Sequence, residues 1–322
     1  MCNKIKDFNL KHLVNVTNSI KIQDFIEPPD GIIYHYTSPN GFKSIIENKK
    51  LRFTDCRYLN DFTEGKYALD LCYKNRDMLF ENNEDIKSAF VKSYEKNDLE
   101  NLSPYNNFQV FQSSFSSNPD SLCLWNYYTK GDSIKGYNIG FDSAKCYGLN
   151  NEAIDSKFKK LDLKRTTYIG RVIYSEDEQL RKIKDIIEKY SEFFVLEYRG
   201  YFPIIIHMIM DKIKSIGVFF KPECFKIEEE IRIAFYFENE NYSENDENTK
   251  GIENVKLNFF ERGGIFIPYF DVPFKTGIVQ EIHFSPTLEM TETQNNIYRF
   301  LGIRDFRIDK SKIIKSNIPV RF

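Results

Sequence analysis

Two hydrophobic periodicities alternate along the chain and predict its secondary structure. Runs rich in β-branched and aromatic residues predict strands, and they occupy residues 31–37, 51 onward, 107–117, 135–142, 168–174, 229–238, 264–270, 279–286 and the C-terminal end. Apolar residues at helical spacing predict helices near 10–16, from 39 onward, and over 64–75, 76–106, 120–131, 176–217 and 288–301. The uneven lengths lack the regular alternation of a doubly wound fold, so the pattern predicts an α+β domain.

The clearest local signal surrounds the stretch IIYHYTSPNGF. A turn of Pro28, Pro29, Asp30 and Gly31 precedes a short strand that carries one of only four histidines. Thr37 or Ser38 then caps a helix whose first residue is Pro39, since a side-chain hydroxyl satisfies N–H groups at a helix start and proline needs no such partner there. The pattern thus places His35 in a strand that ends directly at a helix.

The chain reads as one domain with insertions. Residues 1–30 form a lead-in, and residues 31–322 form a single α+β domain with helical inserts near 62–106 and 176–217. The second insert has a break near residues 200–203, where proline interrupts the helical pattern. The acidic, asparagine-rich segment 239–254 is typical of a mobile hairpin loop. These inserts and this loop are where we expect a substrate to be recognised.

Composition excludes several classes of protein. The 322 residues carry 45 Lys and Arg against 47 Asp and Glu, a formal net charge of −2, so only a local basic groove remains open for nucleic acid. The sequence contains no run approaching the roughly 20 apolar residues that span a bilayer, and we expect a soluble, cytoplasmic protein without a membrane partner. Six scattered cysteines lack metal-ligand spacing, so we predict no metal site and no disulfide framework.

Three clusters of residues are candidates for chemistry. They are Tyr34, His35, Tyr36 and Thr37; Phe115, Ser116, Trp125, Tyr127 and Tyr128; and Glu228, Glu230 and Arg232. In one extended strand, Glu228, Glu230 and Arg232 would share a face. That face is either simply the hydrated side of the strand, or the floor of a cleft in which Arg232 pairs with a carboxylate or grips a phosphate.

Structural explanations compete with function for the other two clusters. A strand histidine between tyrosines is often a satisfied, half-buried residue, and a tryptophan near tyrosines is often part of a core. The sequence lacks the P-loop, the dinucleotide-binding glycine motif, the zinc-protease motif and the hydrolase nucleophile elbow. The corresponding chemistries therefore have no support.

Four ordered blocks resemble domain-of-unknown-function family 2971 of bacteria. They are the opening stretch through YLNDFTEG, the block FSSNPDSLCLWNYYTKGDSIKGYNIGFD, the block FKPECFKIEEEIRIAF with its E-x-E-x-R, and the ending SKIIKSNIPVRF. The resemblance spans about residues 32–322. HFSP departs from the glycine-proline that the family shows after that strand.

The same blocks resemble, at the level of the fold, ADP-ribosyltransferases, and this resemblance implies a split antiparallel sheet core that binds NAD as a substrate. It implies that His35 bonds the adenosine ribose, that Thr37 or Ser116 holds the nicotinamide half and that Tyr127 or Tyr128 stacks on its ring. Glu230 would stabilise the charge that develops as the glycosidic bond breaks, and Glu228 would orient or deprotonate the acceptor. Tyr36 and Arg232 complete the expected NAD site, and a bulge would put Glu229 in place of Glu230.

The resemblance therefore predicts a transferase of the glycosyltransferase class, an NAD-dependent ADP-ribosyltransferase. Its acceptor would be an unidentified protein or nucleic acid, and its role bacterial or antiviral defence or that of a toxin, with a regulatory partner protein left open. One alternative is a non-catalytic module that senses nucleotides or binds proteins. Another is a metal-dependent nuclease in which Asp61, Glu64, Glu228 and Glu230 hold a cation.

Overall fold

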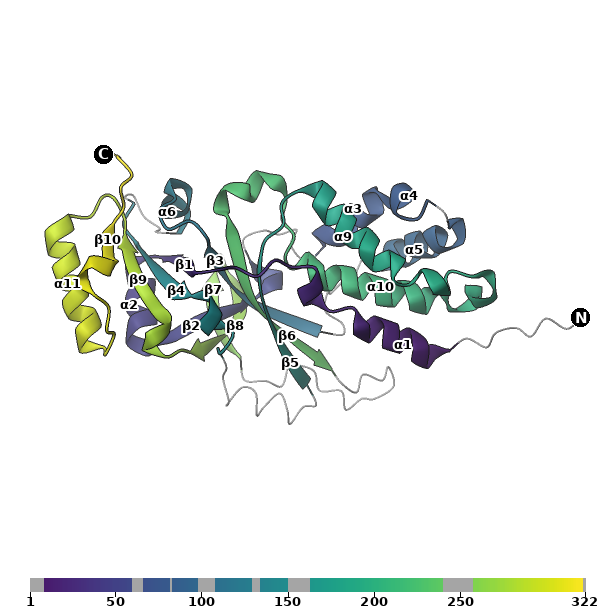
Figure 1. The fold of residues 1–322 in the computed structure, drawn as a ribbon, viewed down its shortest axis with the longest axis horizontal. Helices are drawn as coiled ribbons and strands as arrows, with labels where there is room; N and C mark the ends of the chain where they lie inside the picture. Colours follow the sequence, from purple (N-terminus) through teal and green to yellow (C-terminus); the bar gives the residue numbers. More distant parts are fainter. Residues whose placement is uncertain are drawn as a thin grey trace, which may run out of the picture. The chain divides into compact units, whose positions relative to one another are not determined.

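The computed structural model describes residues 9–59, 66–81, 83–97, 108–128, 134–149, 163–239 and 257–320 (Figure 1). Contacts divide the chain into two compact units. Unit 1 comprises Met1–Glu27, Cys56–Phe108 and Ile173–Glu223, and unit 2 comprises Pro28–Asp55, Gln109–Val172 and Cys224–Phe322. Asp61, Glu64 and most of the segment 239–254 lie outside the described residues, and the single domain from residue 31 onward stays a prediction.

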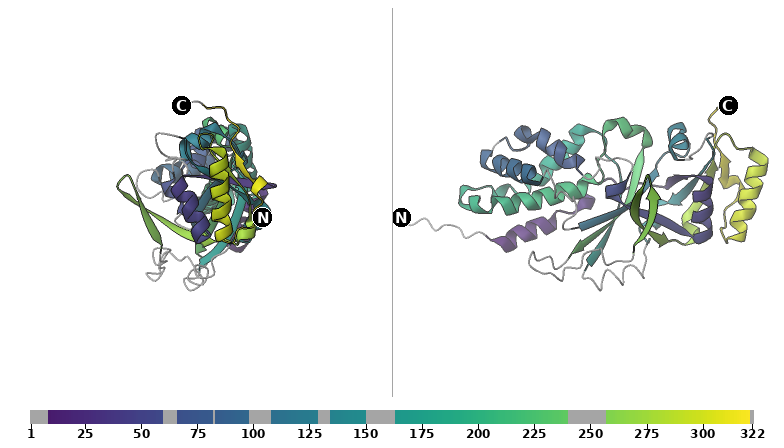
Figure 2. Two further views of the ribbon diagram at one scale, coloured as in Figure 1. Left: turned by 90° about the vertical axis from the view of Figure 1, so that its left-hand side faces the viewer. Right: turned by 180° about the vertical axis from the view of Figure 1, so that it is seen from behind.

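Unit 1 is helical. Its main elements are α1 (Leu10–Ser19), α3 (Tyr67–Lys74), α4 (Arg76–Leu79), α5 (Glu84–Asn97), α9 (Glu176–Glu188) and α10 (Phe202–Gly217). Figure 2 shows α3, α5 and α9 beside the long helix α10, whose apolar residues Ile205, Ile206, Ile209 and Ile213 are fully buried. Both predicted inserts are thus helical where the structure describes them. The predicted break is the short 3-10 helix Leu196–Tyr201 before Pro203.

None of the helices in the described part of the chain combines the length and the apolar character that a membrane span requires.

Unit 2 is built on a ten-stranded, mainly antiparallel sheet, and this large open sheet together with the helices confirms the predicted α+β class. Its path runs β10-β9-β4-β1-β3-β2-β8-β7, with β6 paired to β3 and β5 paired to β6. The strands are β1 (Ile32–Thr37), β2 (Lys50–Asp55), β3 (Phe108–Ser116), β4 (Tyr137–Asp142), β5 (Leu163–Arg171), β6 (Glu230–Asn239), β7 (Asn258–Arg262), β8 (Ile265–Pro273), β9 (Val279–Phe284) and β10 (Ile313–Lys315). Helices α2 (Pro39–Asn48), α6 (Leu122–Tyr128), α7 (Ser143–Cys146) and α11 (Met290–Ile303) complete the unit.

Strand β3 is the branch point of this sheet. It pairs with β1, β2 and β6, and because a strand has only two edges, two of these partners share one edge. The registers place β2 opposite Phe111 and Gln112 and place β1 opposite Ser116. The sheet is therefore split along β3, and the stretch between these two pairings carries Ser114.

The two faces of the sheet differ in chemistry. One face packs into a large apolar core that includes Ile33, Phe111, Phe115, Ile231 and Ile282. The alternating residues form the opposite face, which we call the polar face: Tyr34, Tyr36, Gln112, Ser116, Asn138, Glu230, Arg232, Glu281 and His283, each with less than a tenth of its surface exposed. A buried polar face needs hydrogen-bond partners throughout, and this face is therefore a candidate place for a functional site.

Local signals located most elements correctly. Ser38 is the cap predicted for α2, since its Oγ accepts from the N–H of Gly41 at 3.2 Å. Strand β5 begins at Leu163, several residues before the predicted strand, and β7 was not predicted at all. Both weakly patterned segments are held by pairing with a neighbouring strand, which a local pattern does not reveal.

Candidate functional site

His35 lies at the branch of the sheet. Its Nδ1 is 2.9 Å from the carbonyl oxygen of Ser114, and its ring packs 5.4 Å from that of Phe115. Burial lowers the pKa of His35, and the hydrogen bond to Ser114 offsets part of this effect. Because a carbonyl only accepts, Nδ1 carries the proton of the neutral ring, and Nε2 is an acceptor without a partner among the described residues.

Thr37 ends β1 directly beside the first turn of α2. A Cβ added to Gly41 would lie 2.0 Å from Thr37 Oγ1, so the absence of a side chain at residue 41 is what gives this hydroxyl its place. His35 and Thr37 alternate with Tyr34 and Tyr36, and they therefore project to the same side of β1.

The end of β3 is tied to the residues that precede β6. Ser116 Oγ donates to the carbonyl of Glu228 at 2.8 Å, and the N–H of Ser117 donates to the carbonyl of Glu229 at 3.0 Å. The side chain of Glu229 accepts from Asn118 Nδ2 at 2.9 Å and from Ser117 Oγ at 3.2 Å. Two blocks more than 100 residues apart in the sequence thus form one junction.

The expectation that Glu228 shares a strand face with Glu230 is wrong. Glu228 is the last residue of a 3-10 helix, Glu223–Glu228, and β6 begins only at Glu230. Glu229 between them has a φ of 44°, in the left-handed region that disfavours side chains other than those of glycine, asparagine and aspartate. This residue breaks the period of two that the sequence pattern assumed.

Glu230 and Arg232 form a bidentate ion pair on the polar face. Arg232 Nε donates to Glu230 Oε1 at 3.0 Å, and a terminal guanidinium nitrogen donates to Oε2 at 2.9 Å. Arg232 is fully buried, and Glu230 is 5% exposed. The expected pairing is therefore present, and the pair lies away from bulk water.

Tyr36 is held by the segment that leads into α6. Its hydroxyl donates to the carbonyl of Asn118 at 2.8 Å and accepts from the N–H of Ser121 at 2.9 Å, and burial raises its pKa. Its ring meets that of Trp125 edge-on at 4.8 Å, and Trp125 in turn donates to Asp120. The Tyr36 hydroxyl thus already donates one hydrogen bond and accepts another within the protein.

The aromatic residues at the end of α6 differ in exposure. Tyr127 is 68% exposed, whereas Tyr128 is half-buried against the cluster of Tyr34, Tyr36, Leu124 and Trp125. Tyr127 therefore presents its ring to solvent.

The structure brings some of the predicted site residues together and leaves others apart. Ser116, Glu228, Glu230 and Arg232 gather at the β3–β6 junction. His35 lies against Phe115 of the core, whereas Glu230 alternates with the core residue Ile231. The two residues therefore project to opposite faces of their strands, on either side of the branch strand.

A buried acid–base cluster on β9 was missed by the sequence reasoning. Glu281 Oε1 accepts from the hydroxyl of Tyr34 at 2.8 Å and lies 3.0 Å from Nε2 of His283, while Lys312 Nζ is 3.4 Å from Oε2. The register aligns Tyr34, Gly140 and Glu281 across three strands. A Cβ on Gly140 would lie 2.9 Å from Glu281 Cγ, so the glycine leaves room for the two side chains to meet.

One signal for this cluster was present in the sequence. Glu281 and His283 stand two apart in a strand, and they therefore share a face. The partner Tyr34 lies 247 residues away, and nothing local connects the two strands. Beside them Asn138 Oδ1 is buried and has no hydrogen-bond partner among the residues that the structure describes, which is unusual in a native interior.

Glu281 makes stability depend on pH. Burial alone would raise the pKa of Glu281, but the hydrogen bonds from His283 and Tyr34 and the charges of His283 and Lys312 outweigh it and lower the pKa below 4.5. A lowered folded-state pKa stabilises the fold above the unfolded pKa and loses this contribution as the pH falls through the folded value. We expect Glu281→Gln to destabilise the protein by about 1–3 kcal/mol at pH 7.

The measurement is urea unfolding of the two proteins at pH 7 and at successively lower pH. The difference between them should narrow as the pH falls below 4.5, because the wild-type carboxylate then becomes protonated. A constant difference over this range would contradict the assignment of an ionised Glu281.

The described residues contain no group of three or more His, Cys, Asp or Glu side chains arranged to hold a metal ion. The nuclease hypothesis groups Glu228 and Glu230 with Asp61 and Glu64, and these last two lie outside the described residues. That hypothesis therefore gains no support from the residues in view.

Comparison with known proteins gives a family for part of the chain. No curated protein and no solved structure matches it. Residues 124–233, which run from α6 through β4 and β5 to the Glu230–Arg232 pair on β6, match the model of a family described as "Protein of unknown function (DUF2971)". Over residues 124–233, this match supports the resemblance to domain-of-unknown-function family 2971 found in the sequence.

Proposed function

We propose that this protein is an NAD-dependent ADP-ribosyltransferase that modifies a macromolecule. One observation supports the proposal most: β3 brings together three blocks that lie far apart in the sequence. His35 bonds Ser114, Tyr34 is paired with Ser116, and Ser116 and Ser117 bond the residues that lead into Glu230. The resemblance to transferases of this kind implies that blocks carrying a histidine, a hydroxyl and an E-x-E strand meet at one junction. Because His35 and Glu230 project to opposite faces of their strands, bound NAD would have to reach both across the branch at β3.

His35 has the protonation state that a sugar ligand needs. A ribose hydroxyl can donate to Nε2, because Nδ1–H already donates to Ser114 and burial keeps the ring neutral at pH 7. In the proposal, His35 bonds the adenosine ribose while Thr37 or Ser116 holds the nicotinamide half. Tyr127, with its exposed ring, or Tyr128 stacks on the nicotinamide.

Glu230 supplies the electrostatics of bond cleavage. The bond between ribose C1′ and the nicotinamide nitrogen breaks, and nicotinamide leaves with the electron pair as a neutral molecule. The positive charge that remains on the ribose is stabilised by a nearby carboxylate, much as in glycoside hydrolysis. Arg232 fixes that carboxylate through two hydrogen bonds.

Transfer is completed when an acceptor oxygen or nitrogen attacks C1′ and gives up its proton. Glu228 lies two residues before Glu230, beyond the left-handed Glu229, and its position is fixed through the bond from Ser116 to its carbonyl. In the proposal, Glu228 receives the acceptor's proton.

A second function is favoured by one specific observation. Both oxygens of Glu230 are already bonded by Arg232 within the protein. A carboxylate whose two oxygens already accept from Arg232 favours a non-catalytic module. Such a module would bind the same nucleotide without cleaving it.

The role of His35 is tested by NAD binding, measured by isothermal titration calorimetry in the presence of a chelator. We expect His35→Ala to weaken binding by roughly 10-fold, the worth of one hydrogen bond to a ligand. The exposed His207 on α10 provides a matched control, and His207→Ala should bind NAD like the wild type. Equal binding by wild type and His35→Ala would refute this role, and binding that appears only when a divalent metal replaces the chelator would favour the nuclease.

A further inference from the structure

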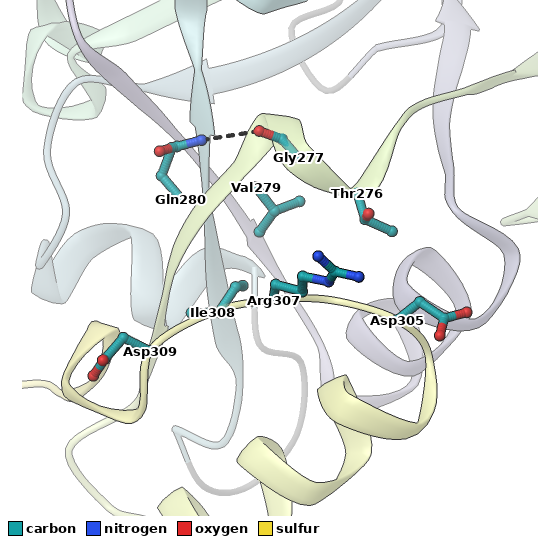
Figure 3. A pocket seen from close by; sticks show the side chains of 8 residues that line it. All are labelled: Thr276, Gly277, Val279, Gln280, Asp305, Arg307, Ile308 and Asp309. Atoms are coloured by element: carbon teal, nitrogen blue, oxygen red, sulfur yellow. Dashed lines mark hydrogen bonds between the residues drawn. The ribbon is translucent and has the colours of Figure 1, made fainter.

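A cavity of about 630 Å³ lies between β9 and the segment that follows α11. Its lining residues are Thr276, Gly277, Val279, Gln280, Asp305, Arg307, Ile308 and Asp309 (Figure 3). Val279 and Ile308 are almost fully buried and give the cavity an apolar floor. The volume is in the range of sites for small molecules, and most of the lining residues are polar.

Arg307 is the cationic group of this cavity. Figure 3 shows its guanidinium extending between the side chains of Thr276 and Asp305. Within the part of the chain that the structure describes, Arg307 makes no ion pair, although Asp305 and Asp309 flank it in the sequence. A guanidinium without a carboxylate partner is free to bind a ligand anion through two parallel hydrogen bonds.

The two aspartates are engaged elsewhere. Asp309 accepts from the N–H and the hydroxyl of Ser311 at 2.8 and 2.7 Å, and these bonds lower its pKa. Asp305 has a φ of 62° in the turn that ends α11, and its carboxylate lies 3.8 Å from Lys49 Nζ. Figure 3 shows the two carboxylates at opposite ends of the lining, directed away from Arg307, and each still has acceptor positions to which ligand hydroxyl groups can donate.

The cavity wall at Gly277 is held by two side chains. Lys145 Nζ donates to the carbonyl of Gly277 in the cavity wall at 3.2 Å, and Gln280 Nε2 donates to the same carbonyl at 3.1 Å. The wall around Gly277 is therefore fixed, and the charge of Lys145 is balanced by Asp142, whose carboxylate lies 3.1 Å from Nζ.

We propose that this cavity binds a phosphorylated sugar, with the phosphate on Arg307 and the sugar hydroxyls on Asp305 and Asp309. The hydroxyl of Thr276 provides a further donor to the phosphate, and Val279 and Ile308 carry the apolar side of the ligand. The ligand is either a free nucleotide or the phosphorylated end of a nucleic acid strand, which share this chemistry. The site goes beyond the proposed function, because none of its residues belongs to the proposed NAD site.

The test is calorimetric titration of the whole protein with ribose 5-phosphate, AMP, adenosine and inorganic phosphate. Ribose 5-phosphate and AMP should bind, and adenosine should bind at least 10-fold more weakly, because it lacks the phosphate. A short oligonucleotide with and without a 5′-phosphate separates the two sources of the ligand. AMP and adenosine are also parts of NAD and can bind the proposed NAD site, so the titrations are repeated with His35→Ala. AMP binding that this variant leaves unchanged, together with binding of ribose 5-phosphate, belongs to the cavity and is independent of the proposed transferase activity.

Variants locate the binding on the cavity. Arg307→Gln should weaken AMP binding by roughly 10- to 100-fold, as expected for the loss of a charge-assisted bidentate contact. Arg299→Gln is the matched control, because Arg299 is an exposed arginine of α11 that does not line the cavity. The proposal is overturned if no phosphorylated sugar binds, if adenosine binds as well as AMP, or if the two variants weaken binding equally.

Discussion

Replacing Arg232 with leucine is expected to lower the free energy of unfolding by about 3–5 kcal/mol, the largest effect on stability that we predict. Arg232 is fully buried, and its guanidinium holds both oxygens of Glu230, which is itself 5% exposed. Removing the arginine takes away the two charge-assisted hydrogen bonds that this guanidinium gives to a buried carboxylate. Urea unfolding at pH 7 measures the effect.

The double variant Glu230→Leu, Arg232→Leu is the control. Replacing a whole buried ion pair by apolar side chains is often neutral or stabilising, so the double variant should be more stable than Arg232→Leu alone. If the single variant unfolds like the wild type, then the pair does not hold the start of β6 in the way described.

Glu230→Gln is expected to lower the rate of nicotinamide release by about 10²- to 10³-fold, the effect of losing one preorganised electrostatic contact in a transition state. Glutamine keeps the shape of the side chain but not the charge that stabilises the developing cation. The binding of NAD should change much less, because the ground state lacks that charge.

Variants of the neighbouring Glu228 and Glu229 test whether the effect is specific to Glu230. Glu228→Gln should slow transfer to an acceptor more than it slows release of nicotinamide, since its proposed partner is the acceptor. Glu229 lies outside the proposed chemistry, and its exposed carboxylate bonds Asn118 and Ser117. If Glu229→Gln lowered the rate of nicotinamide release more than Glu228→Gln or Glu230→Gln, then Glu229 and not Glu230 would be the glutamate that stabilises the developing charge.

Local rules were sufficient for the start of the sheet. The turn before residue 32, the strand with His35 and the helix capped by Ser38 all follow from residue types that act on their immediate neighbours. The branch at β3 could not be predicted in the same way, because pairing with three strands depends on residues far apart in the sequence. The resemblance to a fold with a split sheet, rather than periodicity, supplied that expectation.

Two departures show where a sequence pattern fails. The alternation of Glu228, Glu230 and Arg232 breaks at Glu229, because a left-handed glutamate carries no signal such as glycine would give. The cluster around Glu281 was hidden because its partners Tyr34 and Lys312 come from other strands and turns. Tertiary contacts set the backbone conformation of Glu229 and the charge state of Glu281.

The central claim is that the junction of β1, β3 and β6 breaks the glycosidic bond of NAD with the help of Glu230. Its most direct test is a time course of nicotinamide release from NAD by the purified protein, in the presence of a chelator and a cell extract as acceptor source, with Glu230→Gln measured in parallel. The account predicts release by the wild type and a rate at least 100-fold lower for the variant. Equal release by the two proteins, or no release by a wild type that is folded and saturated with NAD, would contradict it.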